Sequence, residues 1–198
     1  MPPAGPRQLP SYDVRMNAHL RTARIRDGSL LLRPWLPADL AALLEAYRDP
    51  AVQAGSRAPV ADEEAAARWL RAQEEGRESG LRYGFAVVDT ALGDGPVANV
   101  VLHFPGPGSG SAEVGYWTAA PARGRGIAPQ ALGALTGWAF SSFAGDGLVR
   151  LDLLHQVDNE ASCRVAAKAG YRFAEVLPPH PPWPLAGHRH ERRAAGGR

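Results

Sequence analysis

The stretch Arg123-Gly124-Arg125-Gly126-Ile127-Ala128 points most directly to the fold. It follows residues 113–118, whose alternating pattern predicts a strand, and it leads into residues 128–143, whose apolar spacing predicts a helix. A helix start presents unpaired N–H groups and the positive end of a dipole, so a Gly- and Arg-rich turn at this point is suited to hold phosphate. The glycines allow positive φ and leave room for a phosphate near the backbone. The two arginines can add charge-assisted hydrogen bonds.

Two other interpretations of this turn stay open. An ordinary surface turn with solvated arginines would explain an isolated RGRG sequence equally well. A different phosphate ligand, such as ATP or NAD, would also suit a helix start. The stretch is not a Walker A loop, because no Gly-Lys-Ser/Thr follows, and it lacks the G-x-G-x-x-G spacing of a dinucleotide fingerprint.

Three blocks of sequence resemble the GNAT superfamily of acetyl-CoA-dependent N-acetyltransferases. In the first block, Arg123, Gly126 and Ala128 match the family pattern Arg/Gln-x-x-Gly-x-Gly/Ala. The flanking residues 115–117 (GYW) and 130–132 (QAL) look like the Rim-type subgroup, which acetylates the N-termini of ribosomal proteins. The second block, residues 159–162 (NEAS) with 168–173 (KAGYRF), and the third, residues 30–35 (LLLRPW) with Asp39, agree with that subgroup. The resemblance covers roughly residues 29–178.

The order of elements by itself predicts an α+β or mixed α/β fold. The predicted strands cover residues 30–35, 83–89, 97–104, 112–118, 149–154, 171–177 and 188–193, and the predicted helices cover residues 38–48, 62–76, 128–143 and 159–169. The resemblance implies a GNAT-like fold with about four helices around a mostly antiparallel sheet. It also implies that the sheet is splayed between its fourth and fifth strands, residues 112–118 and 149–154. We expect residues 1–27 to form a flexible extension with a helical turn near residues 15–20, and residues 28–198 to form a single domain.

The resemblance also implies roles for individual residues. The turn at 123–128 would bind the pyrophosphate of coenzyme A, and exposed backbone groups of Trp117, Thr118 and Ala119 would pair with its pantetheine arm. Asn159 is expected to cap a helix, and the family adds a hydrogen bond from it to the pantetheine arm. Glu113 is the candidate base, with a structural carboxylate as the alternative interpretation.

The resemblance to the Rim-type subgroup also implies that Ser162 is the candidate hydrogen-bond donor to the leaving thiolate. Many GNAT enzymes carry a tyrosine acid seven residues after the asparagine, but Ala166 occupies that position here. A helix serine that bonds back to a carbonyl is the alternative interpretation.

The histidines and the single cysteine receive structural interpretations. His155 has a suitable pKa for a base, but nothing in the sequence orients it. His188 and His190 alternate near the C-terminus, and no cysteine or carboxylate spacing around them predicts a metal site, so we expect no metal. Cys163 cannot form an internal disulfide and is interpreted as a small apolar residue on a helix.

Charge and hydropathy exclude several classes of partner. The 198-residue chain carries 22 basic and 20 acidic side chains, which argues against a dedicated nucleic-acid binder. The sequence contains no run of 18 apolar residues that would predict a membrane span, and no apolar region that would predict a secretory signal. A cytoplasmic location is therefore expected. A homodimer is compatible with the sequence, which does not decide the oligomeric state.

Two functional hypotheses follow. The first is an acetyl-CoA-dependent N-acetyltransferase that acts on a primary amine, either a protein N-terminus or a small molecule, by direct attack in a ternary complex. The second is a coenzyme A-binding sensor on the same fold without catalysis, because the tyrosine acid is missing and the base is unproven. Thiol release with an amine separates the two.

Overall fold

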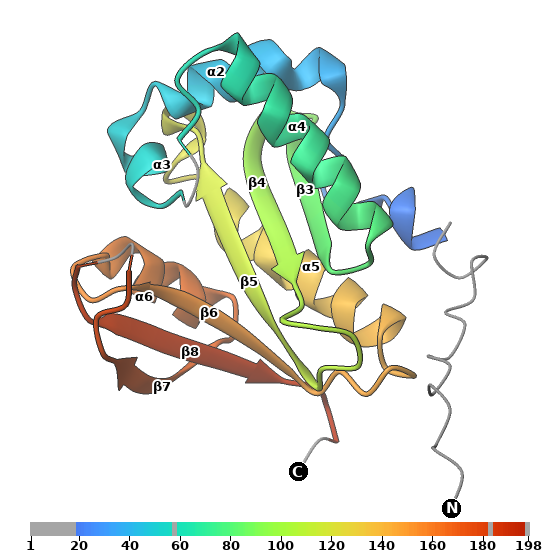
Figure 1. Ribbon diagram of the computed structural model, residues 1–198, viewed down its shortest axis with the longest axis vertical. Coiled ribbons are helices and arrows are strands. Elements are labelled where there is room, and N and C mark those ends of the chain that lie inside the picture. The colour runs from blue at the N-terminus through green and yellow to red at the C-terminus, as the bar shows by residue number, and fades with distance from the viewer. Residues whose placement is uncertain (1–18, 57–58, 182–183, 197–198) are drawn as a thin grey trace, which may run out of the picture.

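A computed structural model describes residues 19–56, 59–181 and 184–196 (Figure 1). Its strands are β1 (Ile25–Asp27), β2 (Leu30–Pro34), β3 (Arg82–Asp89), β4 (Pro96–His103), β5 (Ser111–Thr118), β6 (Arg150–Gln156), β7 (Arg172–Leu177) and β8 (Gly187–Arg193). Its helices are α2 (Leu40–Tyr47), α3 (Pro50–Ala54), α4 (Glu63–Glu78), α5 (Ile127–Ser142) and α6 (Glu160–Lys168), with short 3-10 helices η1 (Pro37–Asp39) and η2 (Ala120–Ala122). Among these residues, no helix is both long enough and apolar enough to cross a membrane.

All the strands join one sheet in the order β1-β2-β3-β4-β5-β6-β8-β7. Neighbouring strands are antiparallel except β5 and β6, which are parallel. The mixed, mostly antiparallel α+β architecture predicted from the sequence is therefore confirmed. The meander β3–β4–β5 carries the chain directly to the turn at residues 123–126.

Helices cover both faces of the sheet, because strand side chains alternate between two cores. In β3, Phe85 and Val87 enter the larger core with Leu132 and Leu135 of α5. Ala86, between them in sequence, enters a smaller core with residues of α2 and α4. Figure 1 shows α4 and α5 on opposite sides of β3 and β4. The sheet is thus the central layer, with α5 packed on one face and the helices α2 and α4 (the α2–α4 layer) packed on the other.

Local sequence signals explain where the helices begin and end. Asp62 caps α4, since its side chain accepts a hydrogen bond from the Ala65 N–H at 2.7 Å. Gly170 follows α6 with a φ of 78°, a left-handed conformation that favours glycine at a helix end. Asp39 is 6% exposed and accepts two hydrogen bonds from Arg33, at 2.7 and 2.8 Å, which fixes the end of β2 to η1.

Two segments differ from the sequence-based expectation. The helix predicted over residues 38–48 does end before Asp49-Pro50, but Asp49 then caps the unexpected short helix α3, and Pro50 fits its first turn, where no N–H is needed. Residues 25–27 were assigned to a flexible extension, but they form β1 against β2, and Leu20 is buried in the larger core. A three-residue strand is too short for periodicity to reveal. Residues 1–18 of the expected extension, including most of its helical turn, lie outside the described residues.

Candidate active site

The sheet opens between β5 and β6. The two strands are paired over four positions, from Ser111 opposite Arg150 to Val114 opposite Leu153. Beyond this point β5 runs on to Thr118 and β6 to Gln156 without pairing with each other, and Figure 1 shows them diverging. The splay inferred from the resemblance is therefore present, and it leaves one side of the upper half of β5 without a partner strand.

The glycine turn sits at the end of β5, after η2. Gly124 and Gly126 have φ values of 75° and 79°, so both occupy the left-handed region that the sequence predicted for them. A Cβ at either position would meet no atom within 4 Å, so the space over the turn is open. Gly126 is the N-cap of α5 and offers no side-chain cap, while the buried Ile127 fixes the helix to the core. The N–H groups of the first turn of α5 are thus not capped by a side chain.

The two arginines of the turn have different surroundings. Arg123 forms an ion pair with Asp49 at 2.6 Å and donates from Nε to the Thr118 carbonyl at 3.1 Å. It therefore ties the turn to α3 and to the end of β5. Arg125 is exposed and lies at the edge of a hollow beside the turn. Of the two arginines, Arg125 is the one whose charge stays available to a bound anion.

Backbone hydrogen bonds decide which groups of β5 face the splay. The Ala119 N–H donates to the Val97 carbonyl at 2.9 Å, so the expectation that this group is exposed is wrong. Successive residues of a strand direct their backbone groups to alternate sides, so Trp117 also faces β4, opposite Asn99. Tyr116 and Thr118 direct theirs toward the open side, where the Thr118 carbonyl already accepts from Arg123 Nε. The Ala119 carbonyl also has a partner, because it accepts from the Ala122 N–H at 2.9 Å.

Tyr116 and Ser162 meet across the lower end of this opening. The Tyr116 hydroxyl lies 2.9 Å from the Ser162 Oγ, and Ser162 is 7% exposed. Ser162 therefore bonds to a side chain of β5, and not to a carbonyl of its own helix. Asn159 caps α6 as predicted, since its Oδ1 accepts from the Ser162 N–H at 3.0 Å. This bond leaves the Asn159 side-chain amide N–H groups for another partner.

The Tyr116 hydroxyl is a site group that sequence reasoning missed. Residues 115–117 were noted only as part of a family resemblance, and nothing in the sequence indicated that Tyr116 would contact α6, 46 residues away. Burial raises the pKa of Tyr116 above its ordinary value of 10.0, and the hydrogen bond with Ser162 partly opposes this shift. The hydroxyl is therefore protonated at neutral pH. The chain lacks a tyrosine at position 166 but brings another tyrosine hydroxyl to the same helix.

Glu113 lies on β5 at the point where the splay begins. It pairs in register with Asp152 of β6, one position before the last paired residues. By strand alternation its side chain shares a face with that of Trp117, which packs against Trp35 and Tyr47 in the α2–α4 layer. Tyr116 is on the other face. The two candidate catalytic groups, Glu113 and Ser162, thus lie on opposite sides of β5.

The structure corrects the interpretation of the histidines. No cysteine spacing in the sequence predicts a metal cluster at His188 and His190, but in the fold Cys163 Sγ lies 3.3 Å from His188 Nδ1 and 3.7 Å from His190 Nε2. His155 is within 3.5 Å of the same sulfur. Cys163 is thus not simply an apolar helix residue, because it contacts three histidines. His155 is one of these three, so its ring belongs to a side-chain cluster. Burial lowers the pKa of His155 below 6.5, which keeps the ring neutral at neutral pH.

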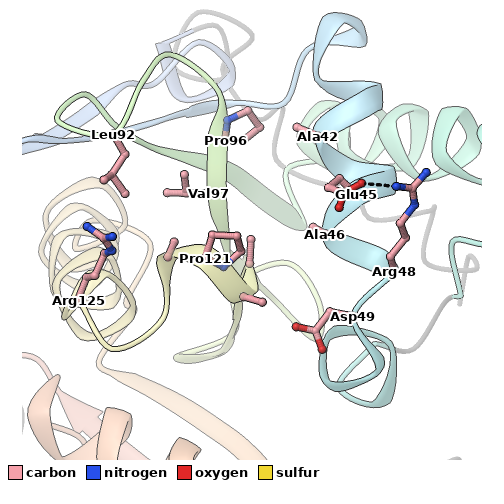
Figure 2. Close-up of a pocket in the computed structure, with 13 residues that line it drawn as sticks. Ala42, Glu45, Ala46, Arg48, Asp49, Leu92, Pro96, Val97, Pro121 and Arg125 are labelled. Atoms are coloured by element: carbon pink, nitrogen blue, oxygen red, sulfur yellow. Dashed lines mark hydrogen bonds and ion pairs between the residues drawn. The ribbon is translucent and has the colours of Figure 1, made fainter.

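A hollow of about 710 Å³ lies beside the turn (Figure 2). It is bordered by α2, the start of β4 and η2, with Arg125 on one side and the Glu45–Arg48 ion pair on the other. Neither Glu113 nor Ser162 lines it. The hollow is therefore next to the turn and separate from the place where the candidate catalytic groups lie.

Comparison with known proteins identifies the family. A family model described as an acetyltransferase (GNAT) domain matches residues 29–172, which is most of the chain. The chain belongs to the GNAT acetyltransferase family. The match covers the splay, the glycine turn and α6, so the GNAT resemblance inferred from three short blocks is confirmed, and with it the assignment as an acetyltransferase. A search of curated proteins found no match in sequence.

Solved structures share the GNAT fold along nearly their whole length. An acetyltransferase from Salmonella typhimurium that modifies the N-terminal serine of ribosomal protein L7/L12 has a TM-score of 0.74 and 18% identity, with 87% of this chain and 99% of that chain covered. RimL in complex with coenzyme A has a TM-score of 0.75 and 20% identity, with 88% of this chain and 100% of that chain covered. RimJ from Mycobacterium smegmatis in complex with a coenzyme A disulfide has a TM-score of 0.68 and 21% identity, with 87% of each chain covered. At sequence identities this low, the structural similarity shows a shared fold and nothing more specific.

Proposed function

We propose that this GNAT protein transfers the acetyl group of acetyl-CoA to a primary amine by direct attack in a ternary complex, and that the acceptor is the α-amine of a protein N-terminus or another amine of low pKa. The observation that carries the proposal is the hydroxyl pair Tyr116–Ser162 at the lower end of the β5–β6 splay, two residues beyond the last paired position of β5. A thioester that entered the splay from the glycine turn would bring its sulfur to this pair.

The cofactor would be held by the turn and by the open side of β5. Gly124 and Gly126 let the pyrophosphate approach the uncapped start of α5, and Arg125 adds charge. The pantetheine amides would pair with backbone groups of Tyr116 and Thr118, as an added strand pairs with a sheet edge. The Asn159 side-chain amide can donate to the same arm. RimL and RimJ structures that contain coenzyme A support a cofactor of this class.

The hydroxyl pair would receive the leaving thiolate. A thiolate that forms at neutral pH needs a hydrogen-bond donor or a proton, because a thiol's ordinary pKa is about 8.5. Tyr116 stays protonated, so it can donate through Ser162 or directly to the sulfur. Ser162 by itself is a weak acid, and its role in this scheme is to hold and relay the hydrogen bond.

The proton of the attacking amine would go to Glu113, directly or through a water molecule. Glu113 faces the α2–α4 layer, so the amine would approach from the face opposite to Tyr116 and the sulfur. The His155 Nε2 lies 3.5 Å from Cys163 Sγ, and burial lowers the pKa of the ring, so His155 is the weaker candidate for the base. The acceptor would then contact the aromatic side chains of that layer, which include Trp117 and Trp35.

The chemistry of the base favours an α-amine as the acceptor. An α-amine has a pKa of about 8 and a lysine a pKa of about 10.4, and the difference corresponds to about 3.3 kcal/mol of deprotonation free energy at neutral pH. A single carboxylate with water is better matched to the α-amine. The N-terminal serine modified by the Salmonella protein is an acceptor of this class.

A coupled binding and thiol-release assay tests the proposal. Acetyl-CoA is titrated while tryptophan fluorescence is followed, and a panel of N-terminal peptides and small amines is then added with a thiol reagent. We expect saturable binding and thiol release that depends on the amine. Binding without release for every amine would indicate a coenzyme A sensor, and stronger competition by ATP or NAD than by coenzyme A would indicate another phosphate ligand.

A further inference from the structure

Four potential metal ligands converge between α6 and the C-terminal strands. His155 comes from β6, Cys163 from α6, and His188 and His190 from β8. One ligand atom from each lies within 4.8 Å of every other. The β6–β8 register places His155 opposite His188 and Leu153 opposite His190, so the three rings share the face of the sheet that α6 covers.

The distances fit a tetrahedral ion. The Cys163 sulfur lies 3.5, 3.3 and 3.7 Å from nitrogens of His155, His188 and His190, and the Nε2 atoms of His155 and His190 are 3.2 Å apart. Tetrahedral Zn²⁺ with Zn–S near 2.3 Å and Zn–N near 2.0–2.1 Å separates sulfur from nitrogen by about 3.5 Å and two nitrogens by about 3.3 Å. The side chains therefore already surround a space of the right size.

Hydrogen bonding among these groups does not explain the convergence. The Cys163 thiol has one proton and can donate to only one of the three nitrogens around it. The His155 Nδ1 lies 2.7 Å from the Gln156 carbonyl, which can only accept, so Nδ1 carries the proton and Nε2 presents its lone pair to the cluster. Such a backbone hydrogen bond on the far nitrogen is the usual second contact of a metal-bound histidine.

The fold partly encloses the cluster, three of whose members are half-buried and whose fourth, His190, is buried. The ring of Phe173 in β7 packs edge-on against His188 and His190, with centroid distances of 5.2 and 5.7 Å. His190 is 5% exposed. No aspartate or glutamate belongs to the group, so the donor set is three imidazoles and one sulfur. This set suits Zn²⁺ and disfavours Mg²⁺ or Ca²⁺, which prefer oxygen ligands.

We propose that His155, Cys163, His188 and His190 form a structural Zn²⁺ site that ties α6 to the β6–β8 sheet. Four protein ligands complete the tetrahedron and leave no position for a reacting water, which is the arrangement of structural sites. Cys163 follows Ser162 in α6, so the ion would also fix the helix that carries Asn159 and Ser162. The site stands on its own geometry and does not depend on the proposed transfer reaction.

Metal analysis of the full, untagged chain tests this proposal. Protein expressed with added zinc and purified without a metal-affinity column is analysed by mass spectrometry for metals, and we expect about one zinc per chain. Chelator-treated protein is then titrated with Co²⁺. A tetrahedral Co²⁺ site should show visible d–d absorption and a thiolate-to-cobalt charge-transfer band in the near ultraviolet, and Zn²⁺ should remove both.

Substitutions test whether the bound zinc and the Co²⁺ absorption depend on these four side chains. Cys163→Ser should abolish the charge-transfer band and lower zinc affinity by more than about 100-fold, since loss of even an outer contact reduces affinity about 10- to 100-fold. His190→Gln should have a similar effect on affinity. His180→Gln is the matched control, because His180 is exposed and outside the cluster. Circular dichroism checks that each variant is folded.

Three results would overturn the proposal. They are wild-type protein that neither retains zinc nor binds Co²⁺ tightly, a Co²⁺ spectrum without a thiolate band, or zinc binding that survives Cys163→Ser. If that variant does not fold, the wild-type Co²⁺ titration decides by itself, because it reports both the geometry and the sulfur ligand.

Discussion

The hydroxyl of Tyr116 is the residue on which the proposed chemistry depends most. Tyr116→Phe keeps the ring in the core and removes only the contact with Ser162, so we expect turnover to fall by about 10- to 100-fold as a donor to the thiolate is lost. The KM for acetyl-CoA should change little, since the ring does not bind the phosphates. Initial rates of thiol release and fluorescence titrations measure the two quantities separately. Equal rates in Tyr116→Phe and the wild type would make the pair purely structural.

The two arginines of the glycine turn should behave differently when each is replaced. Arg125→Ala should weaken coenzyme A binding several-fold, and the loss should shrink at high salt because an exposed charge is screened. Arg123→Ala should leave affinity within about twofold and reduce the free energy of unfolding by about 0.2–1 kcal/mol, since Arg123 is paired with Asp49. Isothermal titration at two salt concentrations and urea denaturation give these values. A larger loss of affinity in Arg123→Ala would reverse the assignment.

Tyr171 links stability to pH. Burial raises its pKa to about 12, and its hydroxyl lies 2.6 Å from Thr136, whose own proton is given to the Leu132 carbonyl. Tyr171 must therefore be the donor, and ionisation would remove that bond. Because the folded pKa exceeds the unfolded value near 10, the contribution is complete below pH 10 and is lost as pH rises toward 12.

Tyr171→Phe tests that linkage. The variant should lose about 1 kcal/mol at neutral pH, the value of one hydrogen bond, and should lack the part of the alkaline destabilisation that ionisation causes. Urea denaturation at pH 7, 10 and 11 measures both effects. Identical alkaline slopes in the two proteins would show that ionisation of Tyr171 has no influence on stability.

At the scale of elements, a substitution at the start of α5 should weaken ligand binding without unfolding the protein. Gly126→Val places a β-branched side chain at a φ of 79°, which costs about 1–2 kcal/mol, but its Cβ meets no atom within 4 Å, so the chain should still fold. The added side chain would occupy the open space over the turn, and coenzyme A affinity should fall by more than about 10-fold, roughly the loss of one favourable phosphate contact.

A second glycine in the same helix provides the control. Gly133 lies in the interior of α5, where a Cβ would also meet nothing within 4 Å, so Gly133→Ala should raise stability by about 0.5–1 kcal/mol and leave affinity unchanged. Fluorescence titration and thermal unfolding of both variants make the comparison. Full coenzyme A affinity in a folded Gly126→Val protein would exclude the turn as the pyrophosphate site.

The elements themselves were largely predictable, because their signals are local. The alternation in 112–118 and the apolar spacing in 128–143 gave β5 and α5 to within a residue or two of their ends. The sequence did not indicate β1 or α3, since three to five residues are too few for a period to be visible. The capping role of Asn159 was also local, as the hydrogen bond to Ser162 spans only three residues.

Contacts between distant residues set the limit of prediction for the whole molecule. Tyr116 meets Ser162 and His155 meets His190 only after the strands have been paired, and no spacing in the sequence encodes those distances. The convergence of the three histidines with Cys163 could not be predicted for this reason, since its members come from three separate elements. The splay was inferred through the family resemblance, as composition and periodicity carry no information about where a sheet opens.

The narrow junction between β5 and β6 raises the question of whether the two parts of the sheet fold together. Only four register positions join these strands, but the larger core continues across the junction, where Leu153 of β6 and Ala166 of α6 pack with Leu132 and Leu135 of α5. Shared burial of this kind should couple the parts into one cooperative unit. We therefore expect residues 28–198 to unfold as a single domain, together with Leu20 and β1, which belong to the same core and sheet.

Leu153→Ala in a Trp183→Phe background tests this coupling, because every remaining tryptophan then precedes β6 in the chain. Leu153 is 1% exposed, so its truncation should cost about 2–5 kcal/mol. In one cooperative unit, the urea midpoints from tryptophan fluorescence and from far-ultraviolet circular dichroism should fall together. The neighbouring variant Leu154→Ala should have little effect, since Leu154 is 38% exposed. A fluorescence midpoint that stays unchanged while the circular dichroism curve splits would show that β6–β8 and α6 unfold independently.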